Sequence, residues 1–234
     1  MQSIFQKYDI ELSPEELAKF QKFLEIFMQT NAQINLSAIR DEAGIIEKHF
    51  VDSIMLAAFF DINTEYPEGA KVADLGTGGG FPGIPLAIIT PDAEFTLLDS
   101  VAKKLKCIDD FAEKLDLTNV DTLCGRAEEI GQDPEHREQF DLVVSRATAY
   151  FPTLIEYALP LLKVWWVFAA YKLTDKEEFG SIKKALSRLG GKILKIKNYE
   201  IERQDRSIVF IEKIAPTHKN YPRKVGIPLQ KPIV

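Results

Sequence analysis

Residues 71–83, KVADLGTGGGFPG, join a short apolar strand to a glycine-rich turn and then to the start of a helix. The glycines let the backbone approach a ligand closely. Pro82 is typical of the first turn of a helix, whose free N–H groups would face that ligand. The segment therefore predicts a cofactor-binding loop directly after a strand.

The loop by itself is compatible with two cofactors. Gly78, Gly80 and Gly83 follow the G-x-G-x-x-G spacing of dinucleotide-binding loops, so the spacing does not separate NAD from S-adenosylmethionine. Asp74 stands two residues before the first glycine, where it could accept hydrogen bonds from an ammonium group but would repel a pyrophosphate. The acid therefore favours S-adenosylmethionine.

Short β-rich runs alternate with helical stretches from Lys71 onward, which predicts a parallel sheet with helices on both faces. The two final runs are joined by a short polar segment, which predicts an antiparallel hairpin at one sheet edge. The predicted strands are residues 71–76, 94–99, 120–124, 140–145, 165–172, 192–201 and 207–213. The predicted fold class is α/β: a Rossmann-like class I S-adenosylmethionine-dependent methyltransferase with a mostly parallel seven-stranded sheet.

The N-terminal part of the chain predicts a helical cap. Ser13 and Pro14 form a helix-start signal, and apolar residues then recur with helical spacing. A second helical stretch is expected near residues 45–60. We therefore expect a helical cap over residues 1–66 and a Rossmann-like methyltransferase domain with a basic C-terminal segment over residues 67–234.

Residues at the ends of later strands extend the predicted site. Asp99 ends the second strand, about 20 residues beyond the loop, where a carboxylate takes the ribose hydroxyls of an adenosine. Residues 124–129, CGRAEE, follow the third strand and would place a backbone N–H beside an adenine, although a plain helix cap is the alternative. Arg146 follows the fourth strand, where α/β folds bind their substrates, and we expect it nearest the reaction.

Composition argues against several classes of protein. No apolar run approaches the roughly 18 to 20 residues of a membrane helix, and the N-terminus does not resemble a signal peptide. We therefore expect a cytoplasmic protein that contacts no membrane. Cys107 and Cys124 lack the C-x-x-C spacing of metal or redox sites, which predicts two reduced thiols and no bound metal.

The net charge of −6 conceals a strong asymmetry along the chain. Residues 1–70 carry −7, residues 71–182 carry −8, and residues 183–234 carry +9. A basic C-terminal quarter on an acidic body is expected if one face meets an anionic partner. Lysines placed there for solubility are the alternative explanation.

The chain lacks the motifs of two classes of methyltransferase, which makes their methyl acceptors less favoured. Methyltransferases of the adenine amino group carry an Asn/Asp-Pro-Pro-aromatic run after the fourth strand, where this chain has Ser145-Arg146-Ala147-Thr148. Methylation of pyrimidine C5 needs a loop cysteine as nucleophile, and neither cysteine is so placed. Guanine N7 has an in-plane lone pair and no proton, so its methylation needs alignment more than a general base. The site is compatible with that chemistry.

On these motifs the chain resembles the family of ribosomal RNA small subunit methyltransferase G, also called glucose-inhibited division protein B. The resemblance runs along essentially the whole chain, and its most specific parts are FPG in the glycine loop, GRAEE and SRA. Further matching segments are NLSAIR (35–40), KHFVDS (48–53), LLDSVAKK (97–104), Tyr171-Lys172 and Tyr221-Pro222-Arg223. The resemblance implies N7 methylation of guanine 527 in the 530 loop of 16S rRNA, with S-adenosylmethionine as cofactor and the small ribosomal subunit as partner.

We expect the protein to be a monomer. The resemblance also implies roles for single residues. Arg146 and Lys172 would act at the reacting centre. The implied cofactor-binding residues are Asp74, Gly76, Gly78, Gly79, Gly80, Phe81, Asp99, Ala127, Glu128 and Arg146. Arg40, His49, Lys103 and Arg223 would lie on the RNA side. For His49 the alternative is a satisfied histidine of the cap, and for Lys103 a solvated helix face.

The chain departs from the family pattern before its fifth strand. Trp165-Trp166 stands where the family usually has a Gly-Gly turn. Indoles do not easily adopt the positive φ that glycine accepts, so we expect a different turn geometry or strain. A local change at the strand start is favoured over an aromatic platform for RNA bases.

Three competing interpretations stay open on the residues alone. The first is an S-adenosylmethionine enzyme that acts on a small molecule, which the cap and the basic C-terminus disfavour. The second is a nicotinamide-dependent dehydrogenase, which Asp74 disfavours. The third is a binding or assembly protein that has lost its cofactor through the double tryptophan.

Overall fold

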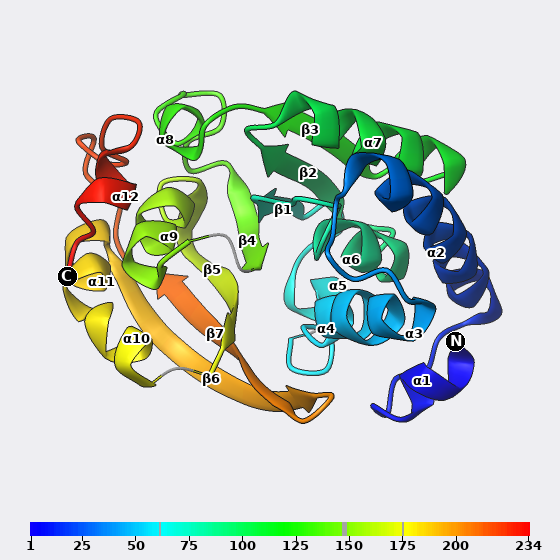
Figure 1. Ribbon diagram of the computed structural model, residues 1–234. Helices are drawn as coiled ribbons and strands as arrows, with labels where there is room; N and C mark the ends of the chain where they lie inside the picture. Colours follow the sequence, from blue (N-terminus) through cyan, green and yellow to red (C-terminus); the bar gives the residue numbers. More distant parts are fainter. Residues whose placement is uncertain (61, 147–148, 175) are drawn as a thin grey trace.

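Seven strands form one sheet in the order β3-β2-β1-β4-β5-β7-β6 (Figure 1). The structure is a computed structural model that describes residues 1–60, 62–146, 149–174 and 176–234, without the side chains of residues 63, 64 and 176–178. The strands are β1 (Lys71–Leu75), β2 (Glu94–Asp99), β3 (Val120–Cys124), β4 (Phe140–Arg146), β5 (Leu162–Leu173), β6 (Gly191–Ile201) and β7 (Gln204–Lys213). Strands β1 to β5 are parallel, and β7 runs antiparallel to β5 and β6. The predicted sheet with its antiparallel edge hairpin is confirmed.

Helices cover both faces of the sheet because successive strand residues point to opposite sides. In β4, Leu142 and Val144 belong to one hydrophobic cluster, whereas Val143 belongs to the other. The first face packs on α6 (Gly83–Ile89) and α7 (Ala102–Lys114). The second packs on α8 (Ala127–Ile130), α9 (Phe151–Ala158) and α11 (Lys183–Leu189). The remaining helices after the cap are α10 (Lys176–Ser181) and α12 (Ile227–Gln230).

The N-terminal helices lie over the same face as α6 and α7 (Figure 1). They are α1 (Gln2–Gln6), α2 (Pro14–Ile34), α3 (Glu42–Ile45), the π-helix η1 (Ile46–Val51), α4 (Asp52–Ile54) and α5 (Ile62–Glu65). The helix start predicted at Ser13 and Pro14 is confirmed, and the structure adds a capping box in which the Ser13 hydroxyl accepts the Glu16 N–H and the Glu16 side chain accepts the Ser13 N–H. Within the described ranges, no helix combines the length and apolar character that a membrane span requires.

The cap and the sheet share one apolar core. Phe23 of α2 is fully buried, stacks on Phe50 of η1 at 5.1 Å between ring centroids, and meets Phe81 of the glycine loop at 5.6 Å. Phe23 also meets Phe111 of α7 at 5.5 Å. Folding of the cap is therefore linked to the packing of the cofactor loop, and a boundary near residue 66 stays a prediction.

The double tryptophan forms an irregularity inside β5. The register changes from Phe140↔Leu162 to Leu142↔Val167, so β5 has extra residues between these pairs. Trp165 has φ of +73° and its side chain is 69% exposed, whereas Trp166 stacks on Tyr66 at 4.7 Å. The expected strain is present, because an L-residue in the left-handed region costs about 1–2 kcal/mol.

Trp165 lies far from the carboxyl edge of the sheet. Tyr171 lies six residues after it in β5 and pairs with Arg146 at the end of β4. At about 3.3 Å per residue, that separation is roughly 20 Å along the strand. This position does not suit a stacking platform for a base held beside Arg146.

We expect Trp165→Gly to be more stable than Trp165→Ala by about 1 kcal/mol, because both remove the indole but only glycine adopts the positive φ without strain. Urea unfolding of the two variants measures the difference. Equal stability, or a more stable alanine variant, would mean that the backbone at this position is not strained.

Candidate functional site

A cavity of about 820 Å³ opens at the carboxyl ends of the central strands. Its size lies within the usual range for pockets that enclose a small ligand, about 300–1,000 Å³. The glycine loop, the cap and the β6–β7 hairpin all contribute to its wall. The lining residues include Ser37, Lys48, His49, Gly76, Gly78, Gly79, Phe81, Asp99, Lys104, Ala127, Glu128, Arg146, Leu154, Tyr157, Gln204, Arg206 and Leu229.

The glycine loop bends away from β1 with backbone angles that favour glycine. Gly78 has φ of +61° and Gly80 has φ of +93°. A Cβ on Gly78 would meet nothing nearer than the Gly76 carbonyl oxygen at 4.0 Å, so the cavity side of this residue is open. A Cβ on Gly80 would lie 2.8 Å from Ile84 Cγ1, so glycine is also required there by packing.

Asp99 fastens the loop to the end of β2. Its Oδ2 accepts the Gly78 N–H at 3.1 Å, and its Oδ1 accepts the Val101 N–H at 2.9 Å. Lys104 lies 3.9 Å from Oδ2 and also lines the cavity. The predicted ribose-binding carboxylate therefore stands at the cavity wall and is oriented by backbone donors.

Asp74 lies behind the loop and outside the described lining of the cavity. It is fully buried, and its Oδ2 accepts the Gly83 N–H at 2.8 Å. Within the described residues its Oδ1 has no hydrogen-bond partner. Burial raises the pKa of Asp74 to about 6. Asp74 therefore shapes the turn into α6, and its predicted contact with the cofactor's ammonium group stays a prediction.

Glu128 and Ala127 line the end of the cavity beyond β3, as the CGRAEE motif indicated. Glu128 is 5% exposed, and its Oε1 accepts the Tyr157 hydroxyl at 3.1 Å and the Gly226 N–H at 2.9 Å. Two donors on one oxygen hold this carboxylate in place. Tyr157 and Gly226 were not predicted, because they are 29 and 98 residues away from Glu128 in the sequence.

These residues fit S-adenosylmethionine. The open face of Gly78 provides a place where the ligand can approach the backbone, and Asp99 and Glu128 provide oriented acceptors for hydroxyl and amino groups. Gly76, Gly78, Gly79 and Phe81 of the glycine loop line the same cavity.

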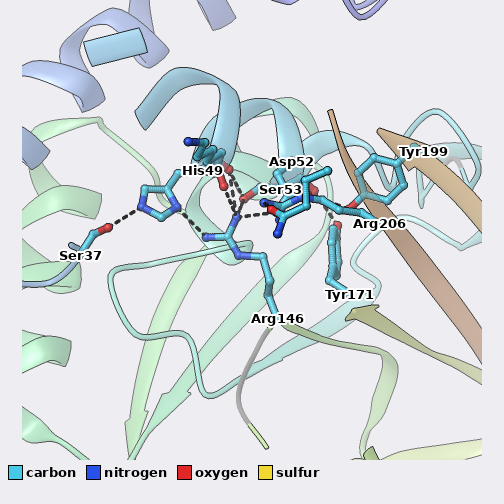
Figure 2. A network of polar contacts seen from close by, with 10 residues as sticks. Ser37, His49, Asp52, Ser53, Arg146, Tyr171, Tyr199 and Arg206 are labelled. Carbon is cyan, nitrogen blue, oxygen red and sulfur yellow. Dashed lines mark hydrogen bonds and ion pairs between the residues drawn. The ribbon is translucent and has the colours of Figure 1, made fainter. Parts of the chain in front are cut away.

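Arg146 lies at the centre of a polar network between the cap and the sheet (Figure 2). One guanidinium nitrogen donates to Asp52 Oδ2 at 3.0 Å and to the Lys48 carbonyl at 3.0 Å. The other donates to His49 Nδ1 at 3.1 Å. The guanidinium also lies 5.2 Å above the Phe81 ring. The arginine expected nearest the reaction is thus held at the cavity wall in one orientation.

His49 is a neutral member of this network. Because a guanidinium only donates, Nδ1 of His49 must accept, and Nε2 then carries the proton toward Ser37 Oγ at 2.7 Å. The imidazole also stacks on Phe81 at 4.5 Å. Burial and the nearby charge of Arg146 lower the pKa of His49 to about 3. Both ring nitrogens are occupied, so His49 serves as a support between cap and loop in this arrangement.

The His49 pKa predicts a pH effect on stability. An unfolded histidine takes up a proton near pH 6.5, whereas the folded one does so only near 3. The unfolded state therefore binds more protons between these values, and this group lowers stability as pH falls by about 1.4 kcal/mol per unit. Asp74, with its folded pKa of about 6, acts in the opposite direction between about 6 and 4.

Comparison with a His49→Gln variant isolates the histidine, since Asp74 is common to both proteins. Relative to the original protein, the variant should gain about 1.4 kcal/mol for each unit that the pH falls between 6 and 4. Chemical denaturation at several pH values measures this difference. A difference that does not change with pH would show that His49 is protonated alike in both states.

Asp52 joins Arg146 to the β6–β7 hairpin. It is 1% exposed, and its Oδ2 also accepts from Arg206 at 2.9 Å, while its Oδ1 accepts the Tyr199 hydroxyl at 2.7 Å. Tyr171 completes the contact by donating to the Ser53 carbonyl at 2.5 Å. The sequence analysis did not predict Asp52, Tyr199 and Arg206 as site residues. KHFVDS contains Asp52, but no spacing links it to an arginine 154 residues away.

The remaining predicted residues lie outside the described lining of the cavity. Lys172 donates to the Ala149 carbonyl at 3.2 Å and lies 5.4 Å above the Phe151 ring. Arg40 is exposed and donates to Asn35 at 2.7 Å, and Lys103 is exposed on the first turn of α7. Arg223 is paired with buried Glu156 at 2.6 Å. Ala147 of the SRA motif falls outside the described residues.

Sequence comparison matches most of this chain to one family of proteins. The family model described as rRNA small subunit methyltransferase G matches residues 16–209. A protein named ribosomal RNA small subunit methyltransferase G from Clostridium novyi is 43% identical over 97% of this chain and 93% of its own length. A protein of the same name from Desulfitobacterium hafniense is 43% identical over 98% of this chain and 94% of its own length.

Solved structures share the fold at low sequence identity. An S-adenosylmethionine-dependent O-methyltransferase from Thermotoga maritima has a TM-score of 0.54 at 17% identity, over 71% of this chain and 66% of its own. TYW2 from M. jannaschii, solved in complex with AdoMet, has a TM-score of 0.54 at 15% identity, over 70% and 76% of the two chains. The predicted class I methyltransferase fold is confirmed.

Proposed function

Since this chain belongs to the ribosomal RNA small subunit methyltransferase G family, we propose that it methylates N7 of guanine 527 in the 530 loop of 16S rRNA, acting on the small ribosomal subunit. The cofactor is S-adenosylmethionine. The observation that carries the proposal is a single cavity lined by the glycine loop, Asp99 and Arg146. We further propose that it acts as a cytoplasmic monomer without a metal.

The chemistry requires alignment rather than proton removal. S-adenosylmethionine supplies an electrophilic methyl group when bound. The N7 lone pair forms the new N–C bond while the S–C bond breaks, and the sulfur keeps the bonding electrons. No proton leaves N7 in this step, so a site whose histidine is neutral and fully hydrogen-bonded suits the reaction.

We propose that the cavity wall between cap and hairpin receives the target guanine. Arg146 and Arg206 line this wall and share Asp52 as ion-pair partner, and Lys48, paired with Glu202, also lines it. Arginine donors recognise guanine edges and phosphates well. Lys172 follows Tyr171, the residue of β5 that pairs with Arg146, and we propose that it acts with Arg146 at the reacting centre. Exposed Arg40 and Lys103 contact RNA phosphates in this proposal.

The test uses labelled S-adenosylmethionine and small subunits from cells that lack this modification. Cleavage at N7-methylguanine should map the label to one guanine in the 530 loop. Subunits that already carry the modification serve as the control and should accept no label. Label elsewhere, or no label although the protein binds the cofactor, would assign another methyl acceptor. Parallel reactions with naked 16S rRNA show whether the assembled subunit is required.

A further inference from the structure

The C-terminal segment, residues 214–234, forms a strap that runs from the end of β7 across the loop after α8 and then across α9 (Figure 1). Its first half is fastened to that loop. Arg137 donates to the Tyr221 carbonyl at 2.7 Å, and Gln132 donates to the Pro222 carbonyl at 2.7 Å. A Cβ on Gly131 would lie 2.7 Å from Pro222 Cγ, so the strap packs directly on this glycine.

An ion pair with α9 holds the middle of the strap. Glu156 is fully buried, and Arg223 donates to it from Nε at 2.9 Å, from a terminal nitrogen at 2.6 Å and from its backbone N–H at 2.8 Å. The pairing raises the pKa of Arg223. A buried carboxylate that loses such a partner is strongly destabilised, so this contact is a strong determinant of where the strap lies.

Three residues beyond Arg223 the strap reaches the cofactor cavity. The Gly226 N–H donates to Glu128 Oε1 at 2.9 Å, and the Gly226 φ of +83° suits glycine. Leu229 lines the cavity, and Thr153 of α9 holds the next turn by donating to the Pro228 carbonyl at 2.9 Å. The helix α9 therefore contacts the strap through Glu156 and Thr153 and the cavity through Leu154 and Tyr157.

We infer that the strap is the outer wall of the cofactor site and that Arg223 is a positioning residue for cofactor binding, acting through Gly226 on Glu128. The inference rests on the proposed function in one respect, that this cavity takes S-adenosylmethionine. It replaces the expectation that Arg223 contacts RNA, because its guanidinium is committed to Glu156 and to the Lys231 carbonyl at 2.8 Å. Ligand binding and strap docking should then be coupled in both directions.

The test compares Arg223→Met with Lys224→Met. Each removes one positive charge from adjacent strap positions, but Lys224 is exposed. Calorimetric titration with S-adenosylhomocysteine, without RNA, should show a Kd raised about tenfold or more for Arg223→Met and unchanged for Lys224→Met, since Glu128 would lose the Gly226 hydrogen bond that orients it. Equal affinities in both variants would overturn the inference. A raised KM for RNA with unchanged cofactor affinity would return Arg223 to the RNA side.

If cofactor binding and strap docking are coupled, the ligand should protect the strap from hydrogen exchange. A general loss of stability would not produce this effect. In the unaltered protein, S-adenosylhomocysteine should slow amide hydrogen exchange of peptides within residues 221–231 as well as of the glycine loop. Gly131→Ala, which displaces Pro222 from outside the cavity, should weaken cofactor binding in the same way. Protection of the glycine loop without protection of the strap would contradict the inference while leaving the methyltransferase function intact.

Discussion

An Asp52→Asn variant is expected to lose about 3–5 kcal/mol of stability and at least 100-fold in methyl transfer, because one buried carboxylate serves two arginines and a tyrosine hydroxyl. Asparagine keeps the shape but removes the charge, and its amide group adds donors where Arg146 and Arg206 also donate. Two cations would then repel each other, and Arg146 would no longer be held against the cavity wall.

Chemical denaturation and methylation of unmodified small subunits measure the two effects. Asp205→Asn is the matched control, since it removes the same charge from an exposed position of the neighbouring hairpin and should change neither quantity. Adding Arg206→Gln to Asp52→Asn should restore part of the stability by removing one uncompensated cation. An Asp52→Asn variant as stable and active as the control would show that the network is not required.

Phe23→Ala is expected to destabilise the whole protein by about 3–5 kcal/mol, a large part of a typical folding free energy of about 5–15 kcal/mol. Phe23 is fully buried and touches Phe50 in the cap, Phe81 in the cofactor loop and Phe111 in α7. Its removal leaves a cavity at the junction of three segments. Phe81 would lose support, so cofactor affinity should fall as well.

Urea unfolding monitored by two probes tests this prediction, with Phe59→Ala as the control because Phe59 is only partly buried. The control should lose less than half as much stability. The Phe23→Ala transition should remain single if cap and sheet unfold together. A variant in which the cap unfolds first, with the sheet and its cofactor affinity unchanged, would instead support a separate domain over residues 1–66.

Local sequence patterns determined the sheet and the cofactor loop. Strand alternation, helix-start signals and the glycine turn depend on backbone angles and on periodic burial, which neighbouring residues set. Residues 71–83 alone indicated a strand, a turn and a helix, and all three are present, with the turn lining the cavity. Asp99, Ala127, Glu128 and Arg146 were expected close together because the strand ends of a parallel sheet meet at one edge, and all four line the cavity. Strain at Trp165 was also expected from local sequence, because tryptophan stands where the family usually has a glycine turn. The observed φ of +73° agrees with that expectation.

Tertiary structure decided what holds these residues in place. Asp52 and Arg206 are 154 residues apart, and Glu128 and Gly226 are 98 apart, so no sequence period connects them. Arg223 is a basic residue of the C-terminal segment and was expected to contact RNA, but its guanidinium pairs with a buried glutamate 67 residues earlier. Asp74 accepts the Gly83 N–H, a contact that the sequence did not indicate, while its expected contact with the cofactor stays a prediction. The sequence thus determined which chemistry gathers at the sheet edge, whereas the pairing of charges across distant segments followed from packing, because the partner of a buried charge is set by spatial proximity.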